Sequence, residues 1–72
     1  MVGLKKIQKD IGIKLKDLRL AKGLSQEELY FHTKISRDHI SNIENGKRPV
    51  NVKTLYKFAK FFKVDIIYFF QK

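Results

Sequence analysis

Apolar residues recur at a helical spacing in the first third of the chain. They are separated by four, four and three residues, which places them on one face of a helix: Ile7, Ile11, Leu15 and Leu18. Lysines occupy much of the rest of this segment, and Gly23 stands where a left-handed glycine commonly ends a helix. The pattern predicts a first helix over about residues 6–22.

A full set of start signals marks a second helix. Ser25 and Glu28 have the spacing of a capping box, in which each side chain satisfies a free backbone N–H of the first turn. Leu24 and Leu29 flank this cap as a hydrophobic staple. These signals predict a second helix from residue 26 to about residue 33.

A third, short helix follows after a turn of three or four residues. Ser36 can cap it and Gly46 marks its end, while Ile40 and Ile43 give it a three-residue apolar spacing. The expected range is about residues 37–45. Two short helices joined this tightly form a helix-turn-helix.

Two further caps divide the rest of the chain. Asn51 can cap a fourth helix and Asp65 a last short one. The fourth helix has an apolar inner face, formed by Val52, Leu55, Ala59 and Phe62. No segment shows the sustained alternation of a strand. We therefore predict an all-α fold of five helices in a single domain of residues 1–72, with the helix-turn-helix at about residues 25–45.

The charge of the chain points to a polyanionic partner. Sixteen basic and seven acidic residues give a net charge of +9. Residues 1–24 carry +5 and residues 47–72 carry +6, whereas residues 25–46 between them carry −2. This segregation favours nucleic acid, with an acidic membrane surface as the lesser alternative.

Composition also limits where the protein works. The longest apolar run, Ile66–Phe70, is far shorter than the roughly 20 residues of a membrane span. The lysines near the N-terminus are not followed by the apolar stretch of a secretory signal. The absence of cysteine excludes disulfides and thiolate metal sites and suits a reducing compartment. We expect a soluble, cytoplasmic protein without membrane attachment.

The outward side of the third predicted helix carries side chains that can contact bases. With the two isoleucines turned inward, this side presents Arg37, Asp38, Ser41, Asn42 and Asn45. In the major groove Arg pairs with guanine, Asn pairs with adenine, and Asp accepts from cytosine. Lys47 and Arg48 follow directly and can contact phosphates. Gln26 lies in the first turn of the second helix, where backbone N–H groups attract a phosphate. A solvated helix face often has the same composition, so these residue types alone leave both interpretations open.

Catalytic and metal-binding arrangements are not apparent in the sequence. Asp38, His39 and Ser41 are the residue types of a hydrolytic triad, but on one short helix they cannot converge in its geometry. His32 and His39 lack the cluster of further ligands that a metal site needs. The glycines are too scattered for a phosphate-binding loop. We expect no enzyme activity, no catalytic residue, no metal and no cofactor.

Several motifs run through the chain between about residues 7 and 70. They are Leu24-Ser25-Gln26-Glu27-Glu28-Leu29, Ile35-Ser36-Arg37, Ile40-Ser41, Ile43-Glu44-Asn45-Gly46-Lys47-Arg48, Thr54-Leu55, Ala59-Lys60, Val64 and Phe69-Phe70. Together they resemble the Cro/C1-type helix-turn-helix family, also called the XRE family. The resemblance implies a compact five-helix, lambda-repressor-like domain that binds double-stranded DNA. Within the family, Arg37-Asp38-His39-Ile40-Ser41 and the short chain resemble controller proteins of restriction–modification systems, which are encoded by bacteria or phages.

The resemblance also implies roles for individual residues. The positions that contact bases are Arg37, Asp38, His39, Ser41 and Asn42. Those that contact the DNA backbone are Gln26, Ser36, Asn45, Lys47 and Arg48. Arg19 and Glu44 match positions that form an ion pair between the first and third helices, which makes Glu44 structural although it belongs to the recognition helix.

Two positions depart from the family pattern. Tyr30 stands in the second helix where relatives usually have a small residue, and Lys34 stands in the turn where they usually have glycine. A residue other than glycine there adopts left-handed dihedrals or reshapes the turn, at a cost of about 1 kcal/mol. The departures affect the expected angle between the two helices and leave the motif itself in place.

The C-terminus carries more apolar surface than a chain of this size can bury. A patch of this kind usually marks an interface with a partner, and its members are Ile66, Ile67, Tyr68 and Phe70. We expect a two-fold symmetric homodimer through this segment; the alternative is that these side chains only close the core. Its recognition helices would lie about 34 Å apart, in successive major grooves of a pseudo-palindromic site.

The sequence therefore predicts a dimeric transcriptional regulator that binds an operator and needs no small-molecule ligand. One alternative is an antitoxin whose apolar C-terminus binds a toxin and whose DNA binding is secondary. The neighbouring genes distinguish these two, because an antitoxin gene adjoins that of its toxin. The other alternative, a basic protein that binds acidic membranes, predicts salt-sensitive liposome binding without preference among DNA sequences.

Overall fold

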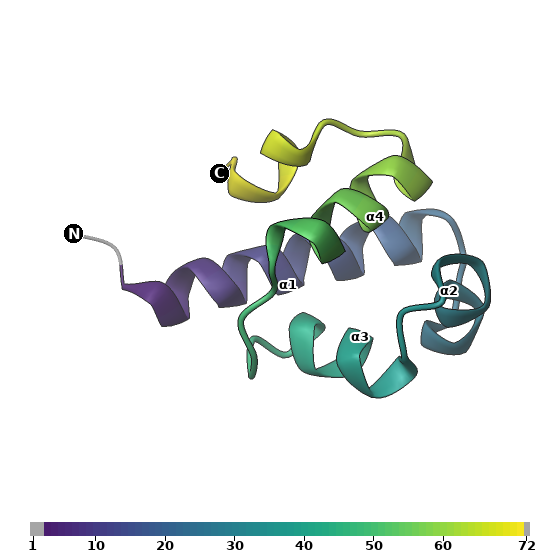
Figure 1. The fold of residues 1–72 in the computed structure, drawn as a ribbon, viewed down its shortest axis with the longest axis horizontal. Helices are drawn as coiled ribbons and strands as arrows, with labels where there is room; N and C mark the ends of the chain where they lie inside the picture. Colours follow the sequence, from purple (N-terminus) through teal and green to yellow (C-terminus); the bar gives the residue numbers. More distant parts are fainter. Residues whose placement is uncertain (1–2, 72) are drawn as a thin grey trace.

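The computed structural model describes residues 3–71 and has four α-helices and one 3-10 helix in that range. The elements are α1 (Leu4–Ala21), α2 (Gln26–Thr33), α3 (Arg37–Glu44), α4 (Val52–Phe62) and the 3-10 helix η1 (Ile66–Phe70). α1 runs along the molecule, with α3 and α4 on opposite sides of it in the view of Figure 1 and α2 near its C-terminal end. This confirms the all-α fold class. Residues 1, 2 and 72 of the predicted domain lie outside the described residues.

Side-chain caps begin the four helices that follow α1, as the sequence predicts. The Ser25 hydroxyl accepts a hydrogen bond from the Glu28 N–H at 3.0 Å, and the Glu28 carboxylate accepts one from the Ser25 N–H at 2.9 Å. This second bond lowers the pKa of Glu28, since it stabilises the charged form. The other caps accept from N–H groups two or three residues on: Ser36 from His39, Asn51 from Thr54, and Asp65 from Ile67.

Several helix boundaries differ from the prediction. α1 begins at Leu4 rather than residue 6, and α3 ends at Glu44, with Asn45 as its C-terminal cap. The last element is a 3-10 helix because its backbone bonds join residues three apart, from the Tyr68 N–H to the Asp65 carbonyl and from the Gln71 N–H to the Tyr68 carbonyl. Within residues 3–71 no helix is both long and apolar enough to cross a membrane.

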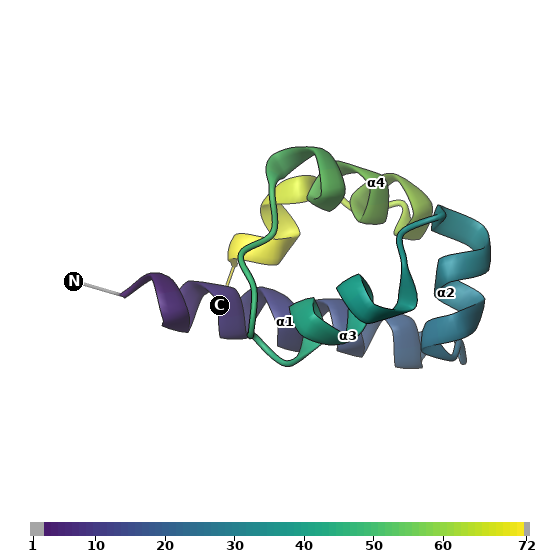
Figure 2. The same cartoon turned by 60° about the horizontal axis from the view of Figure 1, so that its bottom comes forward.

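The core lies between the helices and takes side chains from all five elements. Its buried apolar members are Ile11, Leu15, Leu29, Ile35, Ile40, Ile43, Leu55, Phe58, Ala59, Phe62 and Phe69. Two residues predicted for inner faces are instead exposed: Ile7 by 37% and Val52 by 70%. Ile7 belongs to the start of α1, which extends past the other helices (Figure 2). Val52 is the first residue of α4, one turn before the buried face begins at Leu55.

Gly12 allows α1 and α3 to approach each other closely. A Cβ atom at this position would lie 2.7 Å from the carbonyl oxygen of Glu44 and closer still to that of Ile43. Both oxygens belong to the last turn of α3, so any larger side chain would push the two helices apart. Gly12 is itself buried. Nothing in the apolar pattern of the chain indicates this contact.

Candidate nucleic-acid interface

The turn between α2 and α3 depends on a left-handed lysine. Lys34 has φ 63° and ψ 16°, and its N–H donates to the Tyr30 carbonyl at 2.7 Å. The next residue, Ile35, is buried and anchors the turn to the core. Tyr30 remains 45% exposed, so its ring lies at the surface of α2. The chain thus accommodates both departures from the family pattern and retains a tight helix-turn-helix.

α3 turns its apolar side inward and its polar side out. Ile40 and Ile43 are almost fully buried, whereas Arg37 and Asp38 are exposed. His39, Ser41 and Asn42 are half-buried, so part of each side chain is covered by neighbouring residues and part remains at the surface. The predicted base-contacting residues therefore all reach the surface of one short helix, where a groove of DNA can approach them.

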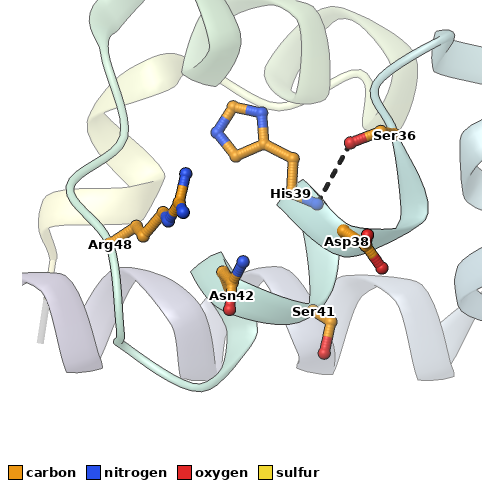
Figure 3. Close-up of a pocket in the computed structure, with 6 residues that line it drawn as sticks. All are labelled: Ser36, Asp38, His39, Ser41, Asn42 and Arg48. Atoms are coloured by element: carbon orange, nitrogen blue, oxygen red, sulfur yellow. Dashed lines mark hydrogen bonds between the residues drawn. The ribbon is translucent and has the colours of Figure 1, made fainter.

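Two hollows flank the polar side of α3. The first, of about 590 Å³, is lined by Ser36, Asp38, His39, Ser41, Asn42 and Arg48. Figure 3 shows the Arg48 side chain reaching from the loop after α3 toward this hollow, on the side of His39 and Asn42. The second, of about 440 Å³, is lined by Arg19, Ser25, Gln26, Glu27, Arg37, Asp38 and Ser41. Asp38 and Ser41 line both, so α3 forms a ridge between them.

An ion pair between α1 and α3 fixes the position of this ridge. The Nε of Arg19 donates to Glu44 Oε2 at 2.7 Å and Nη2 donates to Oε1 at 3.0 Å. Nη1 donates to the Leu24 carbonyl at 2.7 Å, which holds the segment before α2 against α1. Both residues are only 8% exposed. The hydrogen bonds to Glu44 raise the pKa of Arg19, so the guanidinium stays charged.

Gln26 joins the same network. Its side-chain amide donates to Glu44 Oε1 at 3.1 Å, so the carboxylate receives hydrogen bonds from two different helices. The sequence predicts that Gln26 contacts the DNA backbone but does not indicate this contact with Glu44. In the structure Glu44 orients the Gln26 amide at the rim of the second hollow, which leaves its carbonyl oxygen and one N–H for other partners.

A third hollow contains two lysines, Lys5 and Lys9, that were not among the residues predicted to contact DNA. It measures about 470 Å³ and lies between the start of α1 and the turn after α3. Its lining comprises Lys5, Gln8 and Lys9 from α1 and Asn45, Gly46 and Lys47 from the turn. Asn45 and Lys47 were expected to contact the DNA backbone. The helical spacing of Lys5 and Lys9 was visible in the sequence, but their position beside Lys47 follows only from the fold.

The four residues predicted for a dimer interface differ in exposure. Ile67 and Phe70 are exposed, by 56% and 57%, whereas Ile66 and Tyr68 are half-buried against the core. The ammonium of Lys14 also lies over the Tyr68 ring, 4.8 Å from its centre. The free apolar surface of η1 is therefore centred on Ile67 and Phe70.

The family of this chain follows from its similarity to known proteins. The sequence model of the helix-turn-helix family HTH_3 matches residues 15–69. The chain belongs to this family. Its curated relatives include the uncharacterized HTH-type transcriptional regulator y4dJ of Sinorhizobium fredii, 37% identical over 75% of this chain and 70% of that protein. Another is the control protein C.BamHI of Bacillus amyloliquefaciens, 40% identical over 68% of this chain but only 62% of that protein.

A solved structure of the same class superposes closely on this helix-turn-helix chain. It is the restriction–modification controller protein C.AhdI of Aeromonas hydrophila, with a TM-score of 0.80 and 32% sequence identity over 86% of this chain and 94% of that one. The match to the family and to this structure confirms the resemblance that the motifs indicate. The family is one of DNA-binding transcriptional regulators, and its members include controller proteins.

Proposed function

We propose that this protein is a sequence-specific transcriptional regulator that binds an operator as a homodimer, with α3 in the major groove. The observation that carries the proposal is the polar ridge of α3, which projects between two hollows and is supported by a buried ion pair. A helix presented in this way fits the width of the major groove. Such a regulator acts in the cytoplasm of a bacterium, and the relatives favour a controller protein.

The exposures of individual side chains support a division of roles. Arg37 and Asp38, at the start of α3, are the most exposed and lie where a recognition helix first meets base edges. His39, Ser41 and Asn42 lie further along the ridge and contact bases deeper in the hollows. Those that contact phosphates lie at the ends of the ridge: Gln26, Ser36, Asn45, Lys47 and Arg48.

The apolar surface of η1 is the dimer interface in this proposal. Ile67 and Phe70 form its exposed centre, and Ile66 and Tyr68 support it from the core side. A two-fold axis through this surface repeats the α3 ridge, and a spacing of about 34 Å would place the two ridges in successive major grooves. Sedimentation equilibrium at high micromolar concentration is expected to show a dimer, and a chain that stays monomeric there contradicts this part of the proposal.

The test of the whole proposal is selection of bound sites from a random pool of DNA duplexes at about physiological salt. We expect an inverted repeat, whose spacing reports the distance between the two recognition helices. A single half-site would support recognition by α3 without the dimer. Recovery of no shared motif would contradict sequence-specific binding and leave only the attraction of a charge of +9 for DNA.

Arg37→Ala is expected to weaken binding to the selected operator by about 1–3 kcal/mol and to relax the preference at one base pair of each half-site. Arg37 is exposed at the first turn of α3, so its loss removes base contacts without disturbing the core. The measurement is a repeat of the selection, with operator affinities, for the variant. Lys57→Ala, at an exposed position of α4 outside the proposed interface, is the control for the loss of one positive charge. An unchanged base preference in Arg37→Ala would mean that α3 is placed differently on the DNA.

A further inference from the structure

The hollow between α1 and the turn after α3 is strongly basic. Three of its six lining residues are lysines, Lys5, Lys9 and Lys47, and two more have side-chain amides, Gln8 and Asn45. No acidic residue lines it. Within residues 3–71 these lysines form no salt bridge, whereas the neighbouring Lys6 is paired with Asp10, 3.1 Å away. The ammonium groups of the hollow are therefore free to bind an external anion.

Backbone packing places α1 against this turn. Gly46 has φ +68°, and a Cβ atom there would lie 3.1 Å from the Cα of Lys9. Glycine suits this position because its φ is left-handed and a Cβ atom would be crowded against α1, and the contact places Lys9 next to the residue that precedes Lys47. The lysines of the hollow thus lie close together because the backbone of α1 packs against the backbone of this turn. The contact limits how far the Cα atoms of Lys9 and Lys47 can move apart.

One side of α1 extends from the hollow to the contacts with α3. Lys5, Gly12 and Arg19 are seven residues apart, so they follow one another along the same side of the helix. Gly12 contacts the last turn of α3, and Arg19 pairs with Glu44 on α3. Lys5 extends this side of α1 beyond the C-terminal end of α3. An anion in the hollow therefore lies at the end of the ridge proposed to enter the major groove.

We propose that this hollow binds a phosphate of the DNA backbone next to the bases contacted by α3, with Lys5 and Lys9 as additional phosphate ligands beside Lys47. The inference rests on the proposed function and extends its contact surface. The family model matches residues 15–69, so Lys5 and Lys9 lie outside the matched residues. Lysine side chains and amide N–H groups are the donors that bind phosphate oxygens at protein–DNA interfaces.

The first test compares two double variants of the full chain that lose the same charge. Lys5→Ala/Lys9→Ala removes two lysines of the hollow, and Lys6→Ala/Lys60→Ala removes two exposed lysines outside it. Affinity is measured against salt concentration on the selected operator and on an unrelated duplex. We expect the first variant to lower the salt slope by about two per bound protomer on both duplexes and to keep the ratio of the two affinities. The control variant should change the slope by less than half as much.

A second test locates the phosphate. Single phosphates of the operator are replaced one at a time by uncharged methylphosphonates, and binding of the wild type and of Lys5→Ala/Lys9→Ala is compared. We expect at least one position per half-site where the replacement weakens the wild type about tenfold and leaves the variant unchanged. If every position weakens both proteins equally, the lysines act only through the overall charge and the site is disproved.

The outcomes separate this inference from the proposed function. Equal salt slopes for the two double variants would disprove the phosphate site in the hollow, even if Arg37→Ala confirms that α3 contacts bases. Conversely, a chain that selects no sequence but shows the expected slope difference would contradict operator recognition and support the hollow as a site for DNA of any sequence.

Discussion

Glu44→Ala is expected to lower the free energy of unfolding by about 3–5 kcal/mol, because it leaves the buried guanidinium of Arg19 without its partner. Glu44 accepts hydrogen bonds from both Arg19 and Gln26, and it is 8% exposed. The guanidinium of Arg19 cannot escape this penalty by losing its proton, because arginine is so strongly basic that it stays charged even without Glu44. Small domains are stable by only about 5–15 kcal/mol, so the loss should be obvious in urea denaturation followed by circular dichroism.

Two comparisons show whether the cost comes from the stranded charge. Glu27→Ala removes an exposed carboxylate from the first turn of α2 and should cost less than about 1 kcal/mol. The double variant Arg19→Met/Glu44→Leu removes both charges and should be more stable than Glu44→Ala, since apolar residues of similar size replace the pair. A Glu44→Ala chain within about 1 kcal/mol of the wild type would show that water reaches the guanidinium despite its low exposure.

The starts of the four helices after α1 were predictable because side-chain caps act over short distances in the sequence. Ser25 and Glu28 are three residues apart, and their reciprocal hydrogen bonds need no other part of the chain. The same holds for Ser36 and Asn51, each of which accepts from an N–H three residues later. The long-range ion pair between Arg19 and Glu44 was predicted only through the resemblance to the family, since these residues are 25 positions apart in the sequence.

Contacts that depend on how two helices meet were not predictable from the pattern. The expected burial of Ile7 was wrong because the start of α1 extends past the helices that cover the rest of its apolar side. The basic hollow was missed for the same reason, since Lys5 and Lys9 approach Lys47 only through the turn after α3. A spacing of three or four residues identifies one side of a helix but not the element that lies against it.

Gly12→Ala is expected to lower the free energy of unfolding by about 2–3 kcal/mol, even though alanine is the better helix former. In a helix exposed to solvent the same change stabilises by about 0.5–1 kcal/mol. Here the added Cβ would lie within 3 Å of two carbonyl oxygens of α3, and backbone atoms cannot move aside as a flexible side chain can. Urea denaturation gives the sign of the change directly.

Gly3→Ala is the matched control, since a Cβ at Gly3 meets nothing within 4 Å. Gly3→Ala adds the same methyl group at the N-cap residue just before α1 and should change stability by less than about 1 kcal/mol. If Gly12→Ala were instead stabilising, α1 and α3 would be further apart than the structure places them. A wider spacing would also draw Arg19 away from Glu44 and loosen the support of the α3 ridge. A folded Gly12→Ala chain is therefore expected to bind its operator more weakly than the wild type, although position 12 is buried away from the DNA.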